Sequence, residues 1–327
     1  MKAKRGPASA SLCVLAVLLA LLAALPGCGC GGDGPRESLF DDAFDPCAAP
    51  PVNAIGAVSF AESVRFLYEG ACPRQTGVDK AVFDDLRVAV VRGRVVDMAG
   101  APLPGVRIRV AREPRYGETR TQDDGRFDFV VNGGARTRLR FELDGHLLAQ
   151  RSADARANRF LVLDEIALVK ASDTATPLAF GSSDWQIATG DLGKDESADR
   201  RVRLLVPPAT KASAVKVDGS RQPLERGTLR ITEFTRGPRG PSAMPSELPP
   251  ASGYTYASSF LIDELGVDAR VEFESPVIAY LENFLAMRGG AAVPAGALEE
   301  GEDAWKAQTS GRVVSLVSGP SPSLDAN

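Results

Sequence analysis

The sequence has 327 residues, a formal net charge of −4 at neutral pH and a single histidine, His146. An acidic chain without a dense basic segment has little with which to bind a phosphate backbone, so nucleic acid is not an expected partner. One histidine excludes metal sites built from several histidines and most nucleophilic triads, and the common phosphate, dinucleotide and hydrolase motifs are missing. We therefore expect no enzyme and no cofactor.

Residues 1–27 form a predicted signal peptide. Lys2, Lys4 and Arg5 precede an apolar run at 12–25, which is shorter than the roughly 20 residues that span a membrane. Export followed by cleavage is expected rather than a transmembrane anchor. Cleavage removes three positive charges, so the net charge moves from −4 to −7, and the remaining length suits about two domains.

The junction Leu25–Cys28, with the sequence LPGC, resembles the lipobox of bacterial lipoproteins. The resemblance implies that Cys28 becomes the acylated amino terminus, so that acyl chains hold the exported protein at the bacterial cell envelope, at the outer membrane or cell surface. Ordinary signal-peptidase cleavage nearby is the alternative, and it leaves Cys28 as a thiol. Cys30 is a second candidate for the lipid, with Gly27 then in the apolar position of the motif.

The cysteines outside the signal peptide all lie in the first quarter of the chain, at Cys28, Cys30, Cys47 and Cys72. If Cys28 carries lipid, Cys47 and Cys72 are the natural disulfide pair in an oxidising compartment. Their loop of about 25 residues corresponds to about 3 kcal/mol of loop entropy. Zinc is the competing interpretation, but the spacing matches no common ligand pattern and no histidine is nearby, so no metal is expected.

Residues 28–57 are rich in glycine, proline and aspartate and show no hydrophobic period, which predicts a flexible tether. In the segment 58–84 that follows, Ser59 and Glu62 have the spacing of a helix capping box, and apolar residues recur at helical intervals. The pattern predicts one short helix and a connector.

Residues 85–170 change to the alternation of half-buried strands. In the stretch 106–110 the apolar side chains face one way, while Arg107 and Arg109 face the other. About seven short strands at this spacing indicate a β-sandwich.

Two Asp-Gly pairs in the same region, at 124–125 and 144–145, lie between predicted strands. Glycine accepts the positive φ that tight turns require, so each pair predicts a hairpin.

The stretches RGRVVDMAGAPLPGVRIRV, TRTQDDGRFDFVVNGG and LRFELDGHLLAQR resemble the carboxypeptidase-regulatory-like, transthyretin-like β-sandwich. Further motifs in the expected order, among them FLYEGACPRQTGV, WQIATG, PVIAYLENFL and GRVVSL, are similar to the front region of bacterial Rhs/YD-repeat proteins, the prokaryotic relatives of teneurins. The resemblance covers about Phe60 to Leu316. The family's YD repeats, propeller and toxin domain have no counterpart in this sequence, so the resemblance transfers no activity.

Residues 173–317 carry a second β pattern, which predicts a second all-β domain, and 318–327 are expected to form a disordered tail. The expected fold class is mainly β. Two β-sandwich-like domains, the first of them transthyretin-like, follow a signal peptide, a flexible tether and one short helix.

Acidic clusters have both chemical and structural explanations. Asp123, Asp124 and Asp128 could offer oxygens to calcium, but the spacing misses the EF-hand loop and turn chemistry explains them. The run Glu299–Asp303 could supply an acid/base pair, but nothing hydrophobic surrounds it in the sequence, and a solvated loop is expected.

The single histidine and the two tryptophans also allow both a functional and a structural interpretation. His146 follows an Asp-Gly turn, where we expect a ring packed at a strand edge rather than a catalytic base. Trp185 and Trp305 could stack on sugar rings, but we expect both to anchor a β core.

Three hypotheses on function follow. The first is a non-enzymatic envelope lipoprotein whose β domains present a scaffold or binding face. The second is the detached or truncated front piece of an Rhs/YD-repeat toxin or adhesin, acting with a separately encoded YD-repeat protein. The third, a carbohydrate- or cell-wall-binding module, rests only on what β-sandwiches often do.

Overall fold

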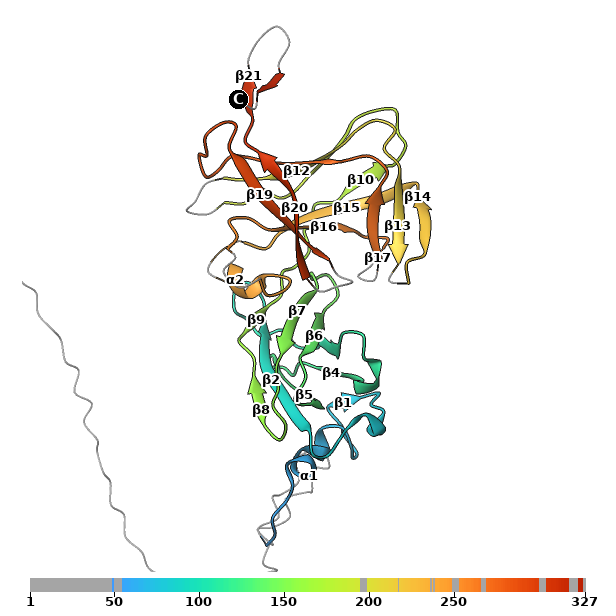
Figure 1. The fold of residues 1–327 in the computed structure, drawn as a ribbon, viewed down its shortest axis with the longest axis vertical. Helices are drawn as coiled ribbons and strands as arrows, with labels where there is room; N and C mark the ends of the chain where they lie inside the picture. Colours follow the sequence, from blue (N-terminus) through green and yellow to red (C-terminus); the bar gives the residue numbers. More distant parts are fainter. Residues whose placement is uncertain are drawn as a thin grey trace, which may run out of the picture. The chain divides into compact units, whose positions relative to one another are not determined.

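The computed structural model describes residue 49 and residues 55–325, except 195–198, 217, 236, 238, 249–252, 266–268, 300–303 and 318–322. The predicted signal peptide, Cys28, Cys30, Cys47 and nearly all of the predicted tether lie outside these residues. None of the helices in the described part of the chain is long and apolar enough to cross a membrane. The described residues are mainly β, as the sequence predicts (Figure 1).

The short helix predicted after the tether is α1 (Phe60–Val64), which continues into the turn η1 (Arg65–Leu67). The backbone N–H of Glu62 donates to the Ser59 hydroxyl over 3.1 Å, so the predicted cap at Ser59 is confirmed. The apolar side of α1 packs against Val88, Val90 and Val130 of the first sandwich.

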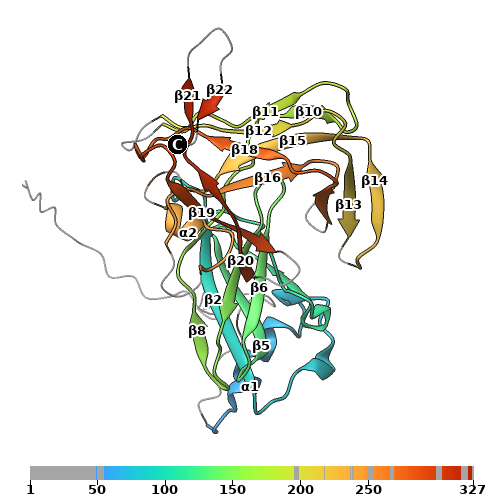
Figure 2. The ribbon, with the colours of Figure 1, turned by 45° about the horizontal axis from the view of Figure 1, so that its top comes forward.

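The first β region contains β1 (Gln75–Thr76), β2 (Val88–Val96), β3 (Arg107–Val110), β4 (Glu118–Arg120), β5 (Arg126–Asn132), β6 (Thr137–Glu142), β7 (Ala149–Ala153), β8 (Phe160–Val162) and β9 (Ile166–Ala167). The turns η2 (Lys80–Val82) and η3 (Pro114–Tyr116) lie among them. One sheet has the order β1-β4-β3-β6-β7. The other has the order β5-β2-β8 (Figure 2), and β9 also pairs with β2 in parallel. The two sheets enclose one apolar core.

Strand β2 is buried on both faces over Val88–Val91, which explains the run of four apolar residues at its start. Ala89 and Val91 belong to the core between the two sheets, whereas Val88 and Val90 face α1. Along β3 the predicted alternation of 106–110 is confirmed, because the apolar side chains are buried and the arginines point outward.

The two Asp-Gly turns differ in what they connect. Gly125 and Gly145 adopt φ values of 77° and 73°, as such turns require. The turn at Gly145 joins β6 and β7, which pair antiparallel, so that hairpin is confirmed. The hairpin predicted at Gly125 is wrong, because β4 pairs with β1 and β3 while β5 pairs with β2. A tight turn reverses the chain locally, but here it carries the chain from one sheet to the other.

After β9 the described residues form three three-stranded sheets and two two-stranded pairs, which we call the second β region. The sheets are β10-β15-β16, β11-β12-β18 and β14-β13-β17. Their strands are β10 (Thr176–Ala179), β11 (Gln186–Thr189), β12 (Val202–Val206), β13 (Ala212–Lys216), β14 (Arg221–Leu224), β15 (Arg226–Glu233), β16 (Ser258–Ile262), β17 (Ala269–Phe273) and β18 (Ile278–Leu281). An apolar core that includes Leu204, Leu229 and Ile231 lies between the first two sheets.

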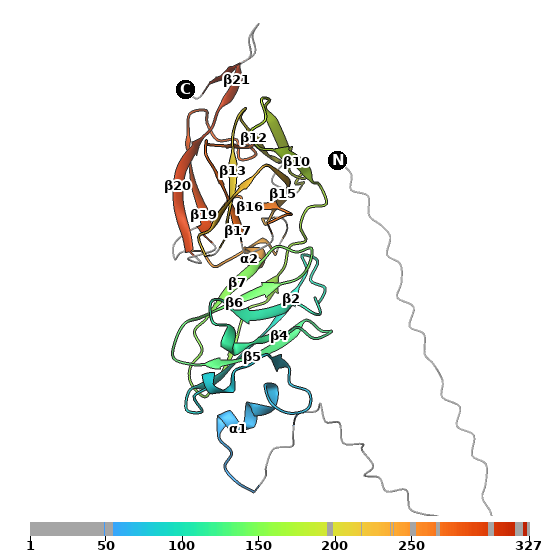
Figure 3. The same cartoon turned by 90° about the vertical axis from the view of Figure 1, so that its right-hand side faces the viewer.

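One pair is the hairpin of β19 (Ala292–Glu299) and β20 (Ala304–Arg312), as Figure 3 shows. A further short pair is formed by β21 (Ser315–Val317) and β22 (Ser323–Asp325). The strand β22 lies in the segment 318–327, where the sequence predicts a disordered tail. The domain boundaries themselves stay predictions.

A segment of the second region covers the edge strand β7 of the first. It starts with α2 (Gly240–Ala243) and runs to Leu248. The backbone N–H of Gln150 donates to the Pro245 carbonyl over 2.8 Å, and that of Ser152 donates to the Glu247 carboxylate. We call residues 240–248 the covering segment.

Arg151 fixes the covering segment to β7. Its guanidinium donates to the carbonyls of Met244 over 2.9 Å, Ser242 over 2.6 Å and its neighbour Gln150 over 2.6 Å. Burial lowers the pKa of Arg151 from its ordinary value. A half-buried cation that donates to three carbonyls holds the two segments in one geometry.

Valine at Gly125 is expected to destabilise the protein strongly. The positive φ resists a β-branched side chain, and a Cβ at this position would lie 2.4 Å from the Val95 carbonyl oxygen. We expect a loss of at least about 2 kcal/mol in the free energy of unfolding, measured by urea denaturation. The control is Arg126→Ala, since Arg126 is 74% exposed and its loss should be less than about 0.5 kcal/mol. A larger loss in Arg126→Ala than in Gly125→Val would contradict the strain assigned to Gly125.

Alanine at Arg151 is expected to lower the free energy of unfolding by about 1–3 kcal/mol, because three part-buried carbonyls lose their donor and a cavity forms. Urea denaturation followed by circular dichroism measures the change. Arg136→Ala is the control, since Arg136 forms an exposed ion pair with Asp154 and should give no measurable change. Equal stability of both variants would show that Arg151 contributes nothing to holding the covering segment.

Candidate functional site

The outer side of the five-stranded sheet carries a concentration of charge. Strict alternation along β3, β4 and β6 buries the apolar residues and directs the intervening side chains outward. We call this surface the arginine face, and its residues are Arg107, Arg109, Glu118, Arg120, Arg138, Arg140 and Glu142. Five arginines against two glutamates make the face positive in a protein that is acidic as a whole.

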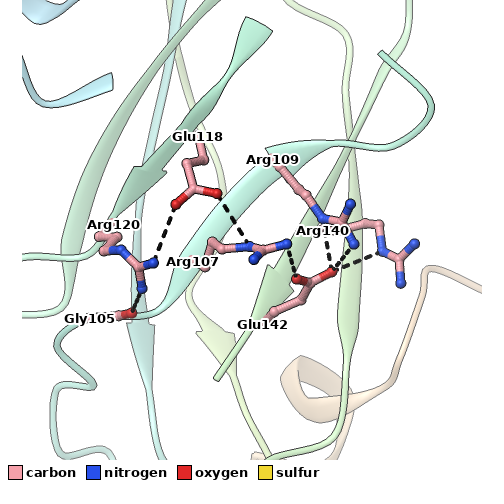
Figure 4. Close-up of polar contacts among 7 residues, drawn as sticks. All are labelled: Gly105, Arg107, Arg109, Glu118, Arg120, Arg140 and Glu142. Carbon is pink, nitrogen blue, oxygen red and sulfur yellow. Dashed lines mark hydrogen bonds and ion pairs between the residues drawn. The ribbon is translucent and has the colours of Figure 1, made fainter. Parts of the chain in front are cut away.

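Glu142 is the centre of the arginine face (Figure 4). Its carboxylate lies 3.1 Å from the Arg107 guanidinium, 2.8 Å from that of Arg109 and 3.3 Å from that of Arg140. The Glu142 side chain is only 14% exposed, so these ion pairs are screened less than ordinary surface pairs. One carboxylate therefore balances three guanidinium groups.

Glu118 plays the same role nearer the sheet edge. It lies 3.5 Å from the Arg107 Nε and 3.3 Å from the Arg120 guanidinium, which also donates to the Gly105 carbonyl (Figure 4). Arg107 thus bridges the two glutamates. Both carboxylates are held in ion pairs, an arrangement suited to recognising charge rather than to transferring protons.

A hollow of about 530 Å³ adjoins the arginine face where β3 ends and β4 begins. Arg107, Arg109, Arg112 and Glu118 contribute to its lining. Gly117 forms part of the wall with a φ of 66°, and a Cβ there would lie 2.0 Å from the Thr76 carbonyl oxygen. The close approach of the two backbone segments requires glycine at this position.

The other carboxylate at the rim of the hollow is Glu113. It forms a two-point ion pair with Arg115, whose hydrogen bonds lower the pKa of Glu113. Both groups are exposed, so the pair contributes little to stability.

The cysteine predictions concern residues that the structure describes only in part. Cys72 lies in an exposed turn before β1, while Cys28, Cys30 and Cys47 lie outside the described residues. The lipidation of Cys28 and the pairing of Cys47 with Cys72 stay predictions.

Asp124 and Asp128, two of the aspartates that could have bound calcium, are each engaged in other contacts. Asp124 accepts a hydrogen bond from the Arg126 N–H over 2.9 Å, as expected of a turn residue. Asp128, which lies on β5, forms ion pairs with Arg92 at 2.8 Å and with Arg74 at 3.4 Å. Within the described residues, no group of three histidine, cysteine or acidic residues could hold a metal.

The remaining candidates have different surroundings. His146 is half-buried beside its turn, with Nδ1 3.1 Å from the Asp144 carbonyl oxygen, and its backbone bridges to Lys170. Of the run Glu299–Asp303, only Glu299 lies among the described residues, at the end of β19.

The two tryptophans do not share one role. Trp305 packs against an apolar cluster that includes Met244, as expected of a core anchor. The same expectation is wrong for Trp185, which is 56% exposed directly before β11. Along β11 Ala188 is buried in the core while Ile187 is 55% exposed, so Trp185, two residues before Ile187, lies with the outward positions of the strand.

Sequence reasoning found part of the arginine face. The outward direction of Arg107 and Arg109 follows from the alternation of β3, but the charged positions of β6 were not singled out. The same signal was present there, because TRLRFE alternates in the same manner. What alternation alone does not give is which strands are neighbours, and this decides that Glu142 meets three arginines.

Comparison with known proteins relates one part of the chain to a family. Residues 83–168 match the model of the teneurin TTR-like domain. Teneurin-1 of Gallus gallus is 34% identical over 89 residues, which are 27% of this chain and 3% of the relative. Teneurin-1 of Caenorhabditis elegans is 25% identical over 220 residues, which are 57% of this chain and 8% of the relative.

Among solved structures, the Bacillus anthracis TIE protein aligns with 54% of this chain and 26% of its own, at 12% identity and a TM-score of 0.23. A score this low supports no conclusion. The chain spans less than a tenth of the length of the two teneurins.

Glutamine at Glu142 is expected to lower the free energy of unfolding by about 1–2 kcal/mol, because three neighbouring guanidinium groups lose their counter-charge. Glu118→Gln is the matched control and should cost less, since Glu118 is 34% exposed and contacts two arginines. Urea denaturation at low and high salt measures both, and the Glu142 effect should shrink as salt screens the arginines. An equal loss for the two variants would contradict the central role of Glu142.

The arginine face thus belongs to a region of the chain, residues 83–168, that is similar to the teneurin TTR-like domain, a non-catalytic structural domain.

Proposed function

We propose that this chain is a non-enzymatic lipoprotein of the bacterial cell envelope, whose β domains present the arginine face for recognition of a partner. The observation that carries the proposal is that face itself: a positive, ordered surface on a domain similar to a non-catalytic family. The two carboxylates at its centre are occupied by arginines, so the face is built to bind rather than to catalyse.

The amino-terminal sequence supports the anchor. A basic start, an apolar run and the LPGC junction at Cys28 are together typical of an acylated, exported protein. Two or more acyl chains give stable membrane attachment where a single chain does not. The residues that follow, 28–57, supply the length that separates a membrane from the first domain.

A second candidate is the front piece of an Rhs/YD-repeat toxin or adhesin that acts with a separately encoded YD-repeat protein. The match to the Caenorhabditis elegans teneurin favours it, because 220 matching residues extend well beyond the TTR-like domain. Both β regions then belong together in longer proteins. The DNA downstream of Asn327 discriminates, since YD repeats in any frame would favour this candidate over a separate lipoprotein.

A third candidate, binding of carbohydrate or cell wall, is favoured by the exposure of Trp185. Binding of the protein to cell-wall polysaccharide that is lost in Trp185→Ala would support it. Retention by the polysaccharide in both forms, or in neither, would argue against a stacking role for this ring.

Alanine at Cys28 is expected to release the protein from the membrane fraction or to leave an uncleaved precursor, because the acceptor of the lipid is lost. Membrane fractionation and intact-mass spectrometry measure this. Cys30→Ala is the control and should leave both the mass increment of the lipid and the fractionation unchanged. Unchanged fractionation and mass in Cys28→Ala would exclude lipid at this residue.

A further inference from the structure

Arg112 stands out at the rim of the hollow. It follows β3 and has a φ of 63°, in the left-handed region that favours glycine or asparagine over arginine. In the described part of the chain its exposed guanidinium has neither a hydrogen bond nor an ion pair. A strained residue with an unengaged charge is a feature of binding sites, where the strain serves the ligand.

Arg112 shares the hollow with two further cations, Arg107 and Arg109. Both are already oriented by Glu142, so their positions are set before any ligand arrives. Preorganised guanidinium groups bind carboxylates with less loss of side-chain entropy than free ones.

Each cross-strand row of the arginine face contains two arginines and one glutamate. Cross-strand pairing places Arg120, Arg107 and Glu142 in one row. The next row contains Glu118, Arg109 and Arg140. A uniform polyanion such as nucleic acid would meet the two glutamates at close range, which costs affinity. A polypeptide matches the pattern better, because its carboxylates alternate with hydrogen-bond donors.

The lining of the hollow contains no aromatic ring on which a sugar could stack.

We propose that the hollow is a docking site for an acidic segment of a protein partner, whose carboxylates bind Arg112 together with Arg107 and Arg109. The inference rests on the proposed function, since it names the kind of partner that the arginine face recognises.

The test uses the full chain in detergent micelles and a fluorescent peptide of alternating glutamate and serine. Fluorescence anisotropy should show binding that weakens as salt rises, because the contacts are exposed. Arg112→Asn should lower the affinity about tenfold, the effect of one charge-assisted contact. Its unfolding temperature should be unchanged or higher, since asparagine adopts the left-handed conformation more easily.

Arg126→Asn is the matched control. Arg126 is 74% exposed on β5 of the other sheet, and its substitution removes the same charge. This variant should bind the peptide as the parent does. An equal loss of affinity in both variants would mean that only the overall charge matters, and would overturn the docking site.

Two competitors distinguish other partners. Polygalacturonate carries carboxylates on sugar rings, and double-stranded DNA carries a uniform row of phosphates. Tighter Arg112-dependent binding of either one, or no binding of the peptide at all, would overturn the proposal. Membrane fractionation of the same Arg112→Asn variant should match the parent, so failure of the docking site is separable from failure of the envelope-lipoprotein proposal.

Discussion

The two-sided burial of β2 is the constraint on which the first β region depends. Ala89 and Val91 fill the space between the sheets, while Val88 and Val90 need α1 as a second cover. Because both faces of this strand are occupied, the second sheet keeps a fixed distance and orientation to the five-stranded one. The opposite side of the five-stranded sheet thereby faces outward, and charged side chains can occupy it because they pair with one another there.

Local patterns gave much of this architecture from the sequence alone. The helical cap at Ser59, the alternation of 106–110 and the positive φ of Gly125 each depend on residues close together in the chain, where steric and hydrogen-bonding preferences act directly. The mainly β fold followed from these. The pairing partner of β4 did not, because it is decided by which sheet can bury the strand's apolar side.

The site was predicted less completely for the same reason. Arg107 and Arg109 were placed on the outer side, but Glu142 lies 33 residues from Arg109 in the sequence and meets it only through the neighbouring strands. Trp185 shows the converse, since its size suggested burial while it lies with the outward positions of β11. The type of a residue indicates whether its side chain tends to be buried, but contacts between distant parts of the chain decide whether it is.

The covering segment has a consequence for the order in which the protein matures. Arg151 and its acceptor Met244 are 93 residues apart, so β7 leaves the ribosome well before its cover exists. An uncovered edge strand is a template for pairing with other chains. Until residues 240–248 pack on β7, its edge is open to pairing with another chain. The second β region thus closes the open edge of the first, although it is synthesised later.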